Sequence, residues 1–148
     1  MTTLKNQITD VLKATMRAKE MGKLTVIRGL QAAIKQIEVD DRKELDDAQV
    51  LAVIEKQIKQ RKESIKAFLG ASRDDLASKE QAELEILSQF LPEAMTEEEL
   101  DSIIAQTISA QEATSMKDMG KVMNSLRPLI AGRADPSQVS AKIKAKLS

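Results

Sequence analysis

Six cationic side chains near the end of the chain are the residues whose types and spacing best suit chemistry, and that chemistry is contact with phosphate. Lysine and arginine bind phosphate oxygens through charge and hydrogen bonds, without any cofactor. Residues 113–148 hold seven basic and two acidic side chains. An excess of this kind suits an anionic partner. The predicted contact residues are Lys121, Arg127, Arg133, Lys142, Lys144 and Lys146.

The stretch GRADPSQVSAKI, which runs from Gly132 to Ile143, allows two interpretations. A helix N-terminus with Arg133 beside it is a place where a phosphate can bind. The alternative is a corner between two helices, with Gly132 in the left-handed conformation and Asp135 as the N-cap before Pro136. We favour the corner, because the Asp135 carboxylate would occupy the free amides and repel a second anion. Arg133 is then expected to remain free to reach a phosphate.

The residue types that most enzymes and metal sites depend on are missing. The chain contains no histidine and no cysteine, which removes the commonest general base, any Ser–His triad and thiolate metal ligands. Glu80 and Glu83 are close enough in sequence to share a metal ion, but two carboxylates among lysines are a poor site. The sequence therefore predicts no catalytic residue, no metal site and no cofactor.

Helices must position these residues, because apolar side chains recur at three- and four-residue intervals along almost the whole chain and no strand-like alternation of useful length occurs. Leu91-Pro92 marks a boundary, since proline disfavours the helical conformation of the residue before it. The predicted fold is all-α, with an N-terminal bundle of about four helices in residues 1–92 and a three-helix domain in residues 93–148.

Local signals predict several helix ends. Gly22 is expected to break the first helix from the second. Asp46 or Asp47 is expected to cap a long third helix. Thr96 and Glu99 have the spacing of a capping box, in which each side chain binds the other residue's backbone amide.

Four segments together resemble the YqeY family. They are KQRKESIKAF, ASRDDLASKEQAELEILSQFLP, KDMGKVM and GRADPSQVSAKIKAKL, and the resemblance covers about residues 4–147. The last two segments also resemble the tail domain of the B subunit of the glutamine-dependent tRNA amidotransferase. The resemblance implies a two-part helical protein whose C-terminal part is similar to a tail that contacts the body of tRNA. It also draws attention to Arg61 and Ser64 in the lysine-rich helix, which otherwise reads as a solvated face.

Three functional hypotheses follow. The first is a non-enzymatic module that binds tRNA or another structured RNA through the six cations. The second, implied by the resemblance alone, is a part in carbon–nitrogen ligation with glutamine as the amide donor. The third is a module that binds another protein. No membrane partner is expected, because no apolar run approaches the roughly 20 residues that span a bilayer, and the expected location is the cytoplasm.

Overall fold

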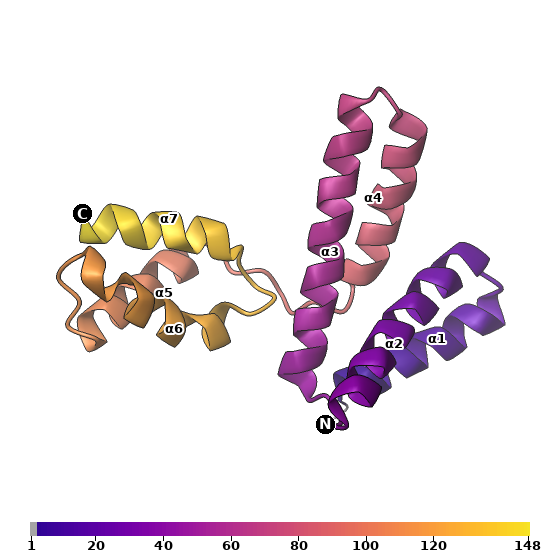
Figure 1. Ribbon diagram of the computed structural model, residues 1–148, viewed down its shortest axis with the longest axis horizontal. Coiled ribbons are helices and arrows are strands. Elements are labelled where there is room, and N and C mark those ends of the chain that lie inside the picture. Colours follow the sequence, from indigo (N-terminus) through magenta and orange to yellow (C-terminus); the bar gives the residue numbers. More distant parts are fainter. Residues whose placement is uncertain (1–2) are drawn as a thin grey trace. The chain divides into compact units, whose positions relative to one another are not determined.

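A computed structural model describes residues 3–148, and all regular structure in that range is helical. The all-α prediction is thereby confirmed. Figure 1 shows the helices in chain order. The elements are α1 (Leu4–Ala18), α2 (Met21–Asp41), α3 (Asp47–Gly70), α4 (Asp74–Ser88), α5 (Glu97–Ala110), a short 3₁₀ helix η1 (Met116–Asp118), α6 (Met119–Ile130) and α7 (Pro136–Leu147).

The chain forms two compact units that meet at the Leu91–Pro92 bond. Unit 1 ends at Leu91 and contains α1 to α4, whereas unit 2 runs from Pro92 to Ser148 and contains α5 to α7. Helix α4 ends at Ser88, three residues before Leu91, so the helix stops earlier than the proline signal alone predicts.

Two helical hairpins build unit 1, and α3 and α4 lie side by side along most of their length (Figure 1). Apolar side chains from all four helices meet in one core. Ile8, Ile27 and Ile54 are among its fully buried members. Burial of these side chains, rather than helix propensity, holds the helices in place.

A smaller core holds unit 2 together. Ile104 from α5, Leu126 from α6 and Ile143 from α7 are each fully buried in it. Because each of the three helices contributes one apolar stripe, the helices enclose their core without a fourth partner.

Residues in the left-handed backbone conformation make most of the turns. Lys19, Arg42, Ser72 and Glu112 have φ between 53° and 59°, although none of them is glycine. The expectation that Gly22 breaks the first helix from the second is wrong, because Lys19 and Glu20 make that turn and Gly22 lies inside α2.

The predicted caps hold in part. Asp46 caps α3 in a reciprocal capping box with Gln49. The Thr96 hydroxyl accepts from the Glu99 amide at 3.1 Å, so the first half of the predicted box is present. Glu99 is turned instead toward Arg133, with which it forms an ion pair.

Candidate functional site

Acidic side chains of α5 meet the predicted cations of α7 inside unit 2. The Lys142 ammonium lies 2.7 Å from a carboxylate oxygen of Asp101. This hydrogen bond raises the pKa of Lys142 above its usual value and lowers the pKa of Asp101 below its own. Lys146 acts on the same carboxylate, since its positive charge contributes to the lowered pKa of Asp101. Lys142 therefore connects α7 to α5.

Arg133 also has partners within unit 2. Its Nε donates to the backbone carbonyl of Glu93 at 2.9 Å, and one terminal nitrogen lies 3.3 Å from a carboxylate oxygen of Glu99. The Arg133 carbonyl accepts from the Met95 amide at 3.0 Å. The expectation that this arginine remains free is wrong, because the Glu93 carbonyl before α5 and the Glu99 carboxylate in the first turn of α5 accept from its donors.

The stretch that begins at Gly132 is a corner between helices, as predicted. Gly132 has a φ of 71°. The Asp135 carboxylate accepts from the Ser137 amide at 3.0 Å, and Pro136 is the first residue of α7. The N-terminus of this helix is thus already capped by an anionic side chain.

The other four predicted cations differ in how far the protein engages them. Lys121 donates to the Gln111 carbonyl at 3.3 Å. Arg127, Lys144 and Lys146 are exposed and form no ion pair within residues 3–148. Lys144 and Lys146 project about 200° apart around the helix axis, because each residue turns the helix by about 100°. The structure thus leaves three of the six predicted residues free of internal hydrogen bonds and ion pairs.

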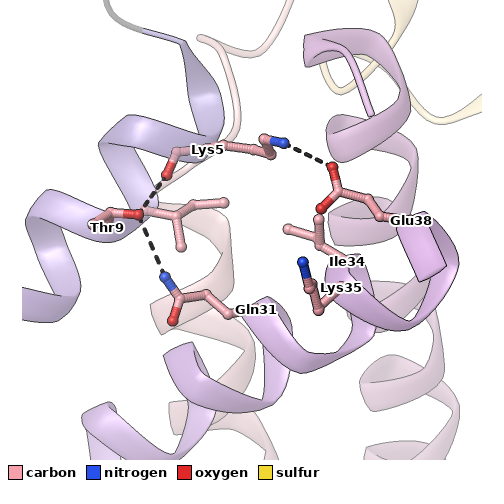
Figure 2. Close-up of a pocket in the computed structure, with 7 residues that line it drawn as sticks. Lys5, Thr9, Gln31, Ile34, Lys35 and Glu38 are labelled. Atoms are coloured by element: carbon pink, nitrogen blue, oxygen red, sulfur yellow. Dashed lines mark hydrogen bonds and ion pairs between the residues drawn. The ribbon is translucent and has the colours of Figure 1, made fainter. Parts of the chain in front are cut away.

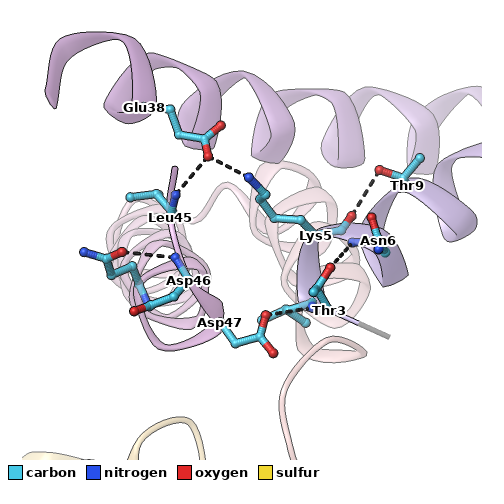
Figure 3. Close-up of polar contacts among 10 residues, drawn as sticks. Thr3, Lys5, Asn6, Thr9, Glu38, Leu45, Asp46 and Asp47 are labelled. Atoms are coloured by element: carbon cyan, nitrogen blue, oxygen red, sulfur yellow. Dashed lines mark hydrogen bonds and ion pairs between the residues drawn. The ribbon is translucent and has the colours of Figure 1, made fainter. Parts of the chain in front are cut away.

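Unit 1 contains a polar cluster that the sequence did not reveal (Figure 3). One carboxylate oxygen of Glu38, in α2, accepts from the Lys5 ammonium at 2.7 Å and from the Leu45 amide at 2.9 Å. The Asp47 carboxylate accepts from the Leu4 amide at 2.9 Å. These bonds tie the start of α1 to the end of α2 and the start of α3. The hydrogen bond from Lys5 is the largest cause of a lowered Glu38 pKa, and it raises the pKa of Lys5.

A small cleft of about 220 Å³ lies beside this pair, between α1 and α2 (Figure 2). Ile8 and Ile34 supply its apolar lining. The Thr9 hydroxyl at its edge donates to the Lys5 carbonyl at 3.0 Å, and the Gln31 amide lies 3.5 Å from that hydroxyl. The volume is below the roughly 300 Å³ at which ligand pockets begin. The Thr9 hydroxyl and the Glu38 carboxylate are both engaged in hydrogen bonds with Lys5. They are therefore not arranged as a nucleophile and its general base, and the cleft is a surface depression.

The α3–α4 hairpin joins two residues from separate family-like segments. Arg61 Nε lies 3.5 Å from a carboxylate oxygen of Glu83, and a terminal nitrogen of Arg61 donates to the Gln57 carbonyl at 3.5 Å. Both side chains are largely buried, so the pair braces the hairpin. Across residues 3–148 no three His, Cys, Asp or Glu side chains are grouped in a way that could hold a metal ion.

The chain matches the family model described as Yqey-like protein over residues 5–147. Among curated relatives, it is 35% identical over 136 residues to altered inheritance of mitochondria protein 41 of Pyrenophora tritici-repentis, covering 90% of this chain and 75% of that protein. The protein of the same name from Lachancea thermotolerans is 32% identical over 139 residues, covering 89% and 74%. The Saccharomyces cerevisiae protein of that name is 40% identical over 91 residues, covering 61% of this chain and 49% of that protein.

These relatives contradict the cytoplasmic location expected from the sequence, because their names assign them to mitochondria. The expectation came from the lack of an apolar run long enough to span a bilayer, and that feature does not distinguish one aqueous compartment from another. Between residues 3 and 148, no helix has both the length and the apolar character needed to cross a membrane.

Proposed function

The chain belongs to the YqeY family, and on that premise we propose that it is a binding module for structured RNA, with tRNA as its first candidate partner. The observation that carries the proposal is that the side chains of three predicted contact residues are exposed and form no hydrogen bond or ion pair within residues 3–148: Arg127, Lys144 and Lys146. Cations that are not engaged in the folded chain can release counterions from a nucleic acid at no cost to the fold.

The proposed recognition reads phosphates and shape rather than bases. The chain has only two aromatic residues, Phe68 and Phe90. Phe90 is buried in the core of unit 1 and Phe68 is half-buried, so neither offers a free platform for stacking an RNA base. Folded RNA presents phosphates and 2′-hydroxyls on its outer surface, and lysine and arginine suffice to contact them.

Titration of purified tRNA with the full chain at low and high ionic strength tests the proposal. We expect the double variant Arg127→Glu, Lys144→Glu to bind about tenfold more weakly and to show a shallower dependence on salt, since each lost phosphate contact lowers that slope by about 0.9. The matched control is Lys56→Glu, Lys59→Glu, which makes the same charge change on exposed positions of α3.

Equal binding by the wild type and the α6–α7 variant would remove these residues from the interface. Equal weakening by the variant and the control would mean that binding depends on the overall charge of the chain and that unit 2 contains no specific RNA site.

A further inference from the structure

The turn between α1 and α2 lies in a segment of unit 1 that carries an excess of positive charge. Residues 11–37 contain six basic side chains and a single acidic one, Glu20. Residues 1–92 as a whole hold 16 basic and 15 acidic side chains. The net charge of this part of the chain is therefore only +1, and it does not reveal the local excess. We call the cations near the turn the basic tip: Lys13, Arg17, Lys19, Lys23 and Arg28.

Within the described part of the chain, the basic tip is almost without internal partners. Glu20 reaches only Lys23, at 4.0 Å, the limit of an ion pair. The other four cations are exposed and form no ion pair in residues 3–148. The connection is short, with α1 ending at Ala18 and α2 beginning at Met21. Figure 1 shows it at the end of the hairpin that lies away from α3 and α4.

Two large apolar side chains are exposed among these cations. Met16 in the last turn of α1 is 49% exposed, and Met21 at the start of α2 is 65% exposed. Contacts with a nucleic acid backbone use charge and hydrogen bonds and have no use for apolar side chains. A bilayer interface gains from both, because anionic headgroups attract the cations and the region beneath them takes up apolar groups.

We propose that the basic tip docks on the surface of a membrane that contains anionic phospholipids, with Met16 and Met21 entering between the headgroups. This site lies in unit 1 and is separate from the RNA contacts proposed for unit 2. The expectation of no membrane partner rested on the lack of a spanning segment, and peripheral docking requires none.

Sedimentation of the full chain with vesicles tests this proposal. One vesicle sample is phosphatidylcholine with about one third phosphatidylserine, and the other is phosphatidylcholine alone. We expect binding to the anionic vesicles only, weakening as salt is added because the Debye length shrinks. The variant Lys13→Gln, Arg17→Gln should bind about 30-fold more weakly, since each cation near such a surface contributes about a fivefold gain.

Two further variants make the test specific. Met16→Gln, Met21→Gln keeps the length, helix propensity and charge of the tip, and we expect it to bind several-fold more weakly. The matched control is Lys56→Gln, Lys59→Gln, which removes two exposed charges from α3 and should bind like the wild type. Circular dichroism of each variant verifies that the helices are intact.

Three results would overturn the proposal: no sedimentation of the wild type with anionic vesicles, equal losses in the tip and control variants, or full binding by the methionine variant. The last result, together with tRNA binding that depends on Lys13 and Arg17, would assign the tip to nucleic acid. Because the RNA test above uses α6 and α7, failure there and failure here are distinguishable.

Discussion

The cations around α7 in unit 2 and the basic tip in unit 1 differ in how far the fold engages them. In unit 2, acidic side chains of α5 face the cations of α7 and of the preceding corner, so that Lys142 and Arg133 are engaged within the fold. In unit 1, the ion pair between Lys5 and Glu38 at the start of α1 is partly shielded from solvent, with the two side chains 33% and 14% exposed. The cations at the other end of that helix have almost no acidic neighbours.

This difference shows that pairing, not the number of cations in a segment, decides which positive charge is available to a partner. Residues 113–148 have an excess of five positive charges, yet half of the predicted contact residues have a partner within unit 2. A lysine whose ammonium already donates to a carboxylate must lose that bond before it can bind a phosphate, which cancels part of the gain.

The largest expected effects are losses of stability from substitutions in the two cores, and they test whether the units differ in packing as well as in charge. Ile54 in unit 1 and Ile104 in unit 2 are both fully buried. We expect Ile54→Ala and Ile104→Ala each to lower the free energy of unfolding by about 2–5 kcal/mol, because each change leaves a cavity in a packed core. Urea unfolding followed by circular dichroism measures both losses. A loss below about 1 kcal/mol in one unit only would mean that the cores differ as well.

Helix caps provide a smaller contrast. Asp46 in unit 1 takes part in a reciprocal box, in which its carboxylate accepts at 2.9 Å and its amide donates to Gln49 at 3.1 Å. Asp135 in unit 2 accepts one bond, from Ser137 at 3.0 Å. We expect Asp46→Ala to cost about 1–2 kcal/mol and Asp135→Ala about 0.5–1 kcal/mol. Urea midpoints of the two variants rank them, and the reverse order would contradict the reciprocal box.

The two closest ion pairs allow a direct comparison with smaller shifts. The Glu38 side chain is 14% exposed, whereas that of Asp101 is 50% exposed. Glu38→Gln and Asp101→Asn remove the charge and keep an acceptor at nearly the same place. We expect the first variant to lower the urea midpoint and the second to leave it almost unchanged, because solvent screens the exposed pair. Equal midpoints for the two variants would show that burial does not separate these pairs.

The smallest expected effect is the contribution of the Lys5–Glu38 pair to the dependence of folding stability on pH. The pKa of Glu38 is below its usual 4.5 in the folded chain, so its stabilisation is present above pH 4.5 and is lost as the pH falls through the folded value. The pKa of Lys5 is above its usual 10.5, so its share is present below pH 10.5 and is lost as the pH rises further. We expect Glu38→Gln to flatten the acid side of the curve. Acid unfolding that is identical in the wild type and the variant would contradict the assigned pair.

Much of the fold could be predicted because helical periodicity is a local signal. Within residues 3–148, the spacing of apolar residues predicted the seven α-helices in order, and the cap at Asp46 follows from one side chain and the amide three residues later. The end of α1 was misplaced because a lysine made the turn. Glycine is favoured in the left-handed conformation, but Lys19 adopts it here, and packing of the hairpin outweighs that local preference.

The site was harder to predict, because its partners are distant in sequence. Lys5 and Glu38 are 33 positions apart, and Lys142 and Asp101 are 41 apart. No pattern of spacing joins such pairs, since only the packing of whole helices brings them together. The sequence did not indicate the basic tip, because the net charge of residues 1–92 also includes the acidic residues of the α2–α3 connection, which offset the cations of the tip.

The four non-glycine residues in left-handed turns also carry a consequence for engineering. Holding such a residue at positive φ costs roughly 1 kcal/mol relative to glycine, and Lys19, Arg42, Ser72 and Glu112 all do so. Replacing any of these four residues with glycine would relieve backbone strain without changing either core, so we expect each such variant to have a higher melting temperature. At Lys19 such a gain would come at the expense of a tip cation, so thermal robustness and surface adhesion would compete at that single position.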